Sequence, residues 1–184
     1  RLTQFGHWSG WIEVDGIIHN IEPTTTSGSR DRSWGVRPIG PPADAGAPVG
    51  ERQFYWLWAP VWFEGFGTVF DVNEHADGQR WHESGAMLIG PDTIKHAHSV
   101  TYDYSWEHGT RRAEKFALQY KFAKDSAELV FTPLVHFQMN GLGYLHPEWN
   151  HGNWKGESVN GGDRFTVPVE DPLEMHNLHT QTLS

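Results

Sequence analysis

The feature that most constrains the fold is an alternation of apolar and polar side chains with a period of two, broken at short intervals by glycine and turn residues. From His98 to Trp106, one parity carries histidine, valine, two tyrosines and a tryptophan, while the other carries serine, threonine and aspartate. Residues 115–122 repeat the alternation after a turn at His108-Gly109. Because successive side chains of a strand point to opposite faces of a sheet, the two segments predict an antiparallel hairpin with one aromatic face.

Similar short strands are predicted along most of the chain. Asp15-Gly16 is a strong hairpin signal between two apolar runs, and Pro133 is expected to interrupt a strand or place it at an edge. The stretch Pro38–Gly50 is expected to be an exposed loop, and no long helix is predicted. The further strands are expected at Trp8–Val14, Ile17–Ile21, Gln53–Phe63, Thr68–Val72, Ala86–Ile89 and Leu129–Phe137. Many short antiparallel strands with turns between them predict an all-β barrel or sandwich.

Composition excludes several functional classes. The chain has 184 residues and a formal net charge of −9, so a nucleic-acid backbone would be repelled and no nucleic-acid partner is expected. It has no long apolar run, which argues against a membrane span. The absence of cysteine suits a reducing compartment, so a cytoplasmic location is expected. The chain begins at Arg1 rather than Met and stops at Ser184 inside a predicted strand, which we interpret as a segment truncated at both ends.

The first candidate site is the segment Gly28–Arg37, in which three arginines surround Asp31 and Trp34. A carboxylate beside an aromatic wall could act as a positioned acid or base. Burial would raise the pKa of Asp31, whereas the arginines would lower it. An equally weighted interpretation is a structural Arg–Asp network that fixes the segment against a sheet edge.

The second candidate is the segment Tyr144–Glu157, which combines two imidazoles, two carboxylates and two indoles. His146, Glu148 and His151 are residue types that bind metals, but their spacing is not that of a helical zinc motif and Pro147 argues against a helix. No metal is therefore expected. On a strand, His146 and Glu148 would share a face, which suits either an acid–base pair or simple mutual hydrogen bonding.

The third candidate is the aromatic run around Trp56 and Trp58, with Trp62 and His75 nearby in the sequence. The simpler interpretation is that these rings fill the interior of a barrel. The functional interpretation is that a set of rings stabilises a cation, either an ammonium group or a carbocation formed during a reaction.

These motifs together resemble the lipocalin-like superfamily of carotenoid 1,2-hydratase (hydroxyneurosporene synthase) and AttH-like proteins. The resemblance rests on residues 6–16, on the Arg30–Gly35 core with the Trp-rich strand after it, and on His146–Gly152, which is similar to a signature of an uncharacterised bacterial branch. It covers most of the chain. It implies two lipocalin-like β domains in tandem, with residues 1–90 forming the C-terminal part of the first and residues 91–184 most of the second.

The resemblance also implies a function. Characterised relatives hydrate an isolated alkene, so the chain is expected to be a hydratase- or isomerase-type enzyme that needs no cofactor and acts on a lipophilic terpenoid-, steroid- or polyketide-like molecule. In this scheme Asp31 supplies the proton, and His146 or Glu148 places the water. The sequence leaves the oligomeric state open. The expected substrate-binding residues are Arg32, Trp34, Arg37, Trp56, Trp58, Trp149 and His151.

Two alternatives from other classes remain. A non-catalytic lipocalin-like module would hold a small hydrophobic molecule in a dry cavity without convergent titratable groups. A carbohydrate-binding β-sandwich would instead need solvent-facing, coplanar tryptophans, and it would be excluded if most of the 10 tryptophans were buried.

Overall fold

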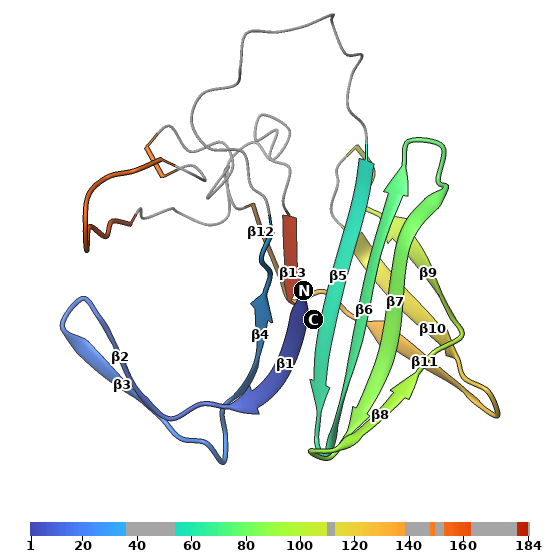
Figure 1. Ribbon diagram of the computed structural model, residues 1–184, viewed down its shortest axis with the longest axis horizontal. Coiled ribbons are helices and arrows are strands. Elements are labelled where there is room, and N and C mark those ends of the chain that lie inside the picture. The colour runs from blue at the N-terminus through green and yellow to red at the C-terminus, as the bar shows by residue number, and fades with distance from the viewer. Residues whose placement is uncertain (36–53, 110–112, 139–147, 150–152, 163–179, 184) are drawn as a thin grey trace, which may run out of the picture. The chain divides into compact units, whose positions relative to one another are not determined.

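The computed structural model describes residues 1–35, 54–109, 113–138, 148–149, 153–162 and 180–183. Every regular element in these residues is a β-strand, and they contain no helix that could cross a membrane. The strands are β1 (Leu2–His7), β2 (Gly10–Val14), β3 (Ile17–Ile21), β4 (Ser27–Arg32), β5 (Phe54–Phe63), β6 (Phe66–His75), β7 (Arg80–Ile89), β8 (Thr93–His96), β9 (Ser99–Trp106), β10 (Ala113–Lys121), β11 (Ser126–Phe131), β12 (Val135–Gln138) and β13 (Thr180–Leu183) (Figure 1).

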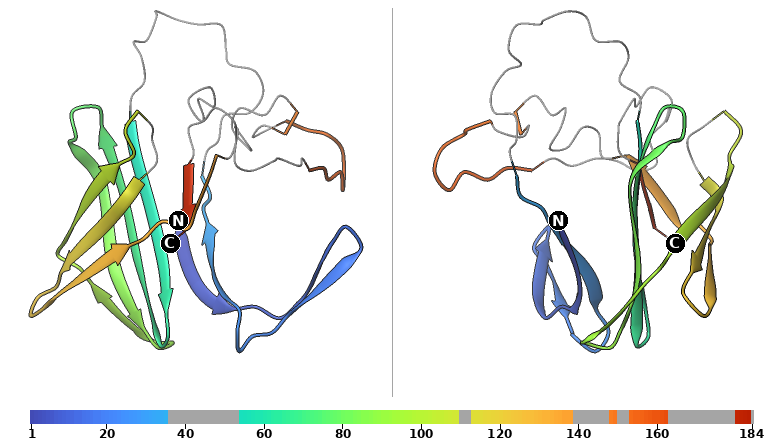
Figure 2. Two further views of the ribbon diagram at one scale, coloured as in Figure 1. Left: turned by 180° about the vertical axis from the view of Figure 1, so that it is seen from behind. Right: turned by 45° about the vertical axis from the view of Figure 1, so that its right-hand side comes forward.

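The strands form open antiparallel sheets. The largest has the order β5-β6-β7-β8, and Figure 2 shows its four strands from two further directions. A three-stranded sheet has the order β11-β10-β9, and three two-stranded sheets pair β1 with β4, β2 with β3, and β12 with β13. The all-β prediction is confirmed. No sheet in the described part of the chain closes into a barrel, so the lipocalin-like topology stays a prediction.

The predicted hairpins are present. The β2–β3 turn places Asp15 at φ 53° and Gly16 at φ 77°, the two positive values that a tight turn between twisted strands requires. Strands β9 and β10 are neighbours, and Pro133 lies in the gap between β11 and β12. Three strands were not predicted from the sequence, namely β1, β4 and β8. The predicted loop Pro38–Gly50 lies outside the described residues.

The chain divides into two compact units, each built from separate stretches of sequence. The first comprises residues 1–35, 49–101 and 120–127, and the second comprises residues 36–48, 102–119 and 128–184. Strand β8, which follows the expected boundary at residue 90, pairs with β7 in the sheet that precedes it. The expected tandem of domains at 1–90 and 91–184 stays a prediction.

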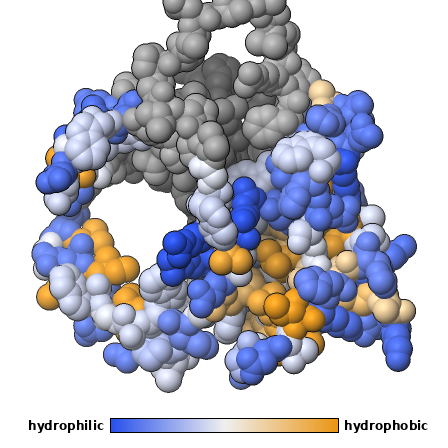
Figure 3. All heavy atoms as spheres, viewed as in Figure 1, coloured by the Kyte–Doolittle hydropathy of each residue, from blue (hydrophilic) through white to orange (hydrophobic). Residues whose placement is uncertain are grey.

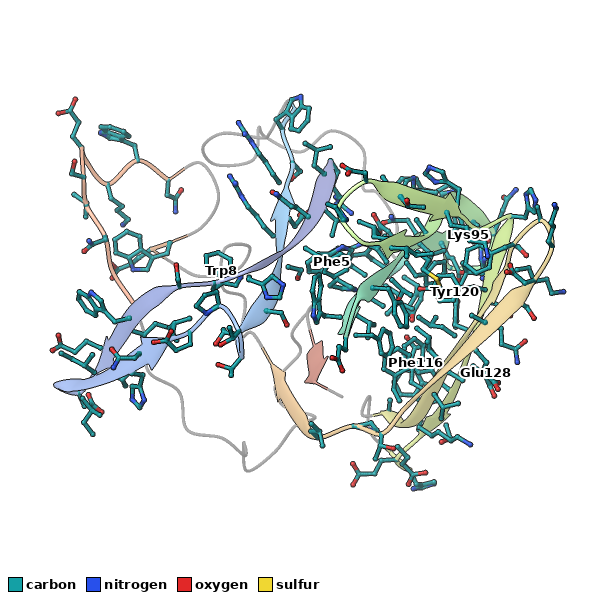
Figure 4. All side chains as sticks on the ribbon, turned by 90° about the horizontal axis from the view of Figure 1, so that it is seen from below. Phe5, Trp8, Lys95, Phe116, Tyr120 and Glu128 are labelled. Carbon is teal, nitrogen blue, oxygen red and sulfur yellow. The ribbon has the colours of Figure 1, made fainter. Side chains whose placement is uncertain are left out.

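The core of the first unit lies on one face of the β5–β8 sheet. Phe70 and Val72 are buried on it, together with Val100 and Tyr120. The close approach needs Gly85, because a Cβ atom at this position would collide with the Val100 side chain. Burial raises the pKa of Tyr120 to about 12. Figure 4 marks Tyr120 within this packed group.

The second unit contains a ladder of stacked rings. The Tyr104 ring stacks on Trp106 and on Phe116, with centroid distances of 4.6 Å in both cases, and Phe116 stacks on Phe131 at 4.8 Å. The rings come from three adjacent strands, as the predicted aromatic face requires. The ladder therefore holds β9, β10 and β11 together by ring stacking.

An ionic cluster fastens the start of β9 to β6 and β7. Arg80 donates from Nε to Glu74 at 3.0 Å and from a terminal nitrogen to the Val100 carbonyl at 2.7 Å. Glu83 lies 2.9 Å from the Arg80 guanidinium and accepts a hydrogen bond of 3.0 Å from the Val100 backbone N–H. Both backbone groups of Val100 are thereby satisfied by side chains.

Pairing with opposite charges shifts the pKa values of Arg80 and Glu83 in this cluster. Burial acts to lower the pKa of Arg80, but the Glu83 and Glu74 carboxylates outweigh it and the pKa is raised. Burial acts to raise the pKa of Glu83, but the Val100 N–H and Arg80 outweigh it and the pKa is lowered from its usual 4.5. Glu83 therefore stabilises the fold above its unfolded pKa, and this stabilisation is lost as pH falls through the lower folded value.

We predict that Glu83→Gln lowers the free energy of unfolding by about 1–2 kcal/mol at neutral pH, because the charge-assisted contacts with Arg80 and Val100 are weakened. The deficit relative to the native chain should shrink between about pH 5 and pH 3, where Glu83 itself becomes protonated. Urea unfolding followed by tryptophan fluorescence measures both quantities. Glu64→Gln, at an exposed glutamate in the β5–β6 turn, is the control. A deficit that does not change with pH would contradict this account.

Candidate active site

The face of the β5–β7 sheet opposite the core gathers aromatic and polar side chains. Trp58 of β5 lies directly across from Asp71 of β6, and Trp56 lies across from Asn73. Asn73 in turn pairs with His82 of β7. Because residues two apart on a strand share a face, Trp56, Trp58, Asp71 and His82 all project from this side of the sheet.

Asp71 is the centre of this group. It is only 6% exposed, and its two carboxylate oxygens have different partners. Oδ1 accepts a hydrogen bond of 2.8 Å from the Trp56 indole, and Oδ2 accepts one of 2.7 Å from the Arg1 guanidinium. A buried carboxylate requires such donors, since an unpaired one would lose its hydration without compensation.

His82 lies beside the same carboxylate. Its Nε2 atom is 3.5 Å from Asp71 Oδ2, and its side chain is 44% exposed. A carboxylate next to one ring nitrogen favours a proton on that nitrogen, which leaves the other free to accept a proton. Such an arrangement of an oriented, accessible imidazole is typical of a general acid–base group.

The indole rings complete the site. The Arg1 guanidinium lies 5.5 Å from the centroid of the Trp56 ring, so this ring already accommodates a positive charge. Trp58 is half-buried, and its Nε1 atom is buried without a hydrogen-bond partner among the residues that the structure describes. Farther along the face, the Phe5 ring packs against Gly67 and Trp62, so β1 covers this part of the sheet (Figure 4).

The first candidate site, around Asp31, is exposed to solvent in the part that the structure describes. Asp31 is exposed on β4, where it pairs with Thr3 of β1. Arg32 and Trp34 are also exposed, and Arg37 lies outside the described residues. The residues that the structure describes form no dry pocket around Asp31, and its catalytic role stays a prediction.

The second predicted constellation is described only in part, because His146 and His151 lie outside the described residues. Glu148 is exposed, and its backbone carbonyl is 3.5 Å from the Asn153 side-chain amide. The Trp149 ring packs onto the backbone of Gly161, where a Cβ atom would collide with it, and Lys155 Nζ lies 6.0 Å from the ring centroid. Within the described residues, no three His, Asp or Glu side chains are arranged to hold a metal ion.

Of the predicted binding residues, the structure brings together Trp56 and Trp58, and it adds Asp71, His82 and Arg1, which the sequence did not single out. One signal was available for Asp71, because it is an acidic residue inside the apolar run Thr68–Val72. A charged residue in a strand that is otherwise buried needs a partner or a function. Nothing in the local sequence of His82 or Arg1 indicates that either would be that partner.

We predict that Asp71→Asn lowers the free energy of unfolding by about 1–3 kcal/mol, because the Arg1 and Trp56 donors lose a buried charged acceptor. Chemical denaturation at neutral pH gives the value. Asp92→Asn, an exposed acid in the β7–β8 turn, should change it by less than about 0.5 kcal/mol. Equal effects of the two substitutions would show that Asp71 is not the anchor of this face.

A family of unknown function (DUF8625) matches residues 1–184. Neither the curated proteins nor the solved structures contain a similar chain.

Proposed function

The chain belongs to the family of unknown function DUF8625, and we propose that it is a cofactor-independent enzyme of the hydratase or isomerase type. Its substrate is a lipophilic molecule of the terpenoid, steroid or polyketide kind. The observation that supports the proposal is the buried Asp71 carboxylate, which contacts Trp56 on one side and His82 on the other. The resemblance to carotenoid hydratases supplies the substrate class.

The proposed chemistry begins with proton transfer to an alkene carbon. Protonated His82 donates the proton, and the positive charge that forms on the neighbouring carbon lies near the indole rings of Trp56 and Trp58. In hydration, a water oxygen bonds to this carbon and one of its protons returns to His82. In isomerisation, His82 instead removes a proton from an adjacent carbon, and the double bond moves. Asp71 holds the imidazole and balances its charge throughout.

Asp31 is the alternative proton donor. Its exposure on β4 gives it no desolvated environment, whereas His82 has a carboxylate partner and an accessible ring. We therefore assign the proton transfer to His82 and keep Asp31 as the competing assignment. His146 and Glu148 stay candidates for placing the water.

The convergence of Asp71, His82 and Arg1 on one face favours an enzyme over a passive binding module. A module that only sequesters an apolar ligand needs no buried carboxylate beside an accessible imidazole. Three titratable side chains instead meet next to two indoles. Such a grouping beside an accessible imidazole is typical of a reactive site.

Carbohydrate binding is a second candidate, favoured by one observation. Six of the 10 tryptophans are about half exposed or more, and none of the ten is buried. Exposed indoles offer faces on which sugar rings stack. The six are Trp8, Trp11, Trp34, Trp81, Trp106 and Trp154.

We predict that the full chain, incubated in D₂O with squalene or an acyclic carotenoid such as lycopene, incorporates deuterium into a carbon–hydrogen position. Both hydration and isomerisation by this route form a new C–H bond from a solvent-derived proton. Mass spectrometry of the extracted lipid detects the added mass. His82→Gln should reduce incorporation by at least about 100-fold, in line with the loss of a general acid.

Asp31→Asn is the matched variant for this experiment. It should retain at least half of the incorporation, because Asp31 lies on another sheet. Loss of incorporation in Asp31→Asn with retention in His82→Gln would move the chemistry to Asp31. Binding of oligosaccharides on a glycan array, without incorporation of deuterium into any lipid, would favour the carbohydrate-binding candidate.

A further inference from the structure

The β2–β3 hairpin exposes a set of large hydrophobic side chains to solvent. Five large hydrophobic side chains within residues 11–18 are each between 50% and 65% exposed. In Figure 3, orange hydrophobic atoms lie at the surface of this part of the chain beside blue hydrophilic ones. The five are Trp11, Ile12, Val14, Ile17 and Ile18.

These side chains occupy both faces of the ribbon. Val14 lies across from Ile17, and Ile12 shares their face, whereas Ile18 lies across from Glu13 on the other face together with Trp11. Figure 4 shows side chains projecting from both sides of the ribbon. An isolated two-stranded hairpin is only marginally stable in water, so a further strand that extends both faces would stabilise it.

The hairpin has room for such a strand. Among the described residues, β2 pairs only with β3, so each of the two strands has an outer edge without a neighbouring strand. An outer edge presents backbone N–H and C=O groups that can pair with an added strand. Addition of an extended peptide to such an edge is a known mode of recognition.

The net charge of residues 8–22 indicates which side chains a matching added strand would carry. Residues 8–22 contain Glu13, Asp15 and Glu22 and neither Lys nor Arg. A second copy of the hairpin would bring the same acidic side chains together, and an anionic lipid surface would also be repelled. A strand that alternates apolar and basic residues matches both the apolar surface and the negative charge.

We propose that the β2–β3 hairpin is a docking site for an extended, basic and apolar segment of a partner protein, which adds to it as a third strand. The apolar side chains of the segment cover those of the hairpin. Its Lys or Arg side chains pair with Glu13 and Asp15. This site is separate from the Asp71 face, so the proposal does not depend on the enzymatic function.

The proposal is tested with two short peptides of the same apolar pattern, one alternating Val or Ile with Lys and the other alternating them with Glu. Isothermal titration calorimetry at low salt should show that the Lys peptide binds at least 10-fold more tightly than the Glu peptide. The difference in affinity should shrink as the salt concentration is raised. Backbone amide shifts in NMR should change first for residues 10–21. Equal affinity for the two peptides, or shifts confined to other strands, would overturn the proposal.

Three variants separate charge from apolar contact. Glu13→Gln with Asp15→Asn should weaken Lys-peptide binding by about 3- to 10-fold, and Asn at position 15 keeps the positive φ of the turn. Ile18→Ser should weaken it at least as much, while Ile94→Ser, at a 58% exposed isoleucine of β8, should leave it unchanged. Concentration-dependent dimerisation abolished by Ile18→Ser, or binding to phosphatidylcholine vesicles instead of the peptide, would also contradict the proposal.

Discussion

The burial of the Asp71 carboxylate is the constraint on which the proposed site depends. A carboxylate in the middle of a strand loses hydration, and in this chain the loss is offset by donors from two other segments, Trp56 of β5 and Arg1 ahead of β1. The requirement therefore links β1, β5 and β6 on one face of the sheet. His82 completes the link to β7 and contributes a ring that reaches solvent.

The two faces of the same sheet serve different purposes. One face carries the apolar core, which packs on Val100 and Tyr120 so closely that Gly85 cannot carry a side chain. The other face carries the indoles of Trp56 and Trp58 together with Asp71 and His82. The core stabilises the sheet, while the opposite face keeps the polar groups to which we assign the proposed proton transfer. The Arg80 cluster belongs to the stabilising side, because it satisfies the backbone of Val100 at the start of β9.

Much of the strand pattern could be predicted from the sequence, since period-two alternation and the Asp15-Gly16 turn are local signals. The strand at residues 27–32 could not, because its polar sequence has no apolar alternation and it forms by pairing with β1. The site was predicted only in part. Trp56 and Trp58 stood out by composition, but the Asp71 partnerships join residues 15 and 70 positions apart in the sequence. Such contacts follow from register between strands, which a motif search along the chain does not reveal.

The central claim is that Asp71 orients His82 for proton transfer, and the tautomer of His82 tests it most directly. Nitrogen-15 NMR of the full chain with labelled histidine distinguishes the protonated ring nitrogen from the bare one. We expect neutral His82 to carry its proton on Nε2, which faces Asp71, and to become a mixture of tautomers in the Asp71→Asn variant. A proton on Nδ1, or a tautomer unchanged by that substitution, would contradict the account.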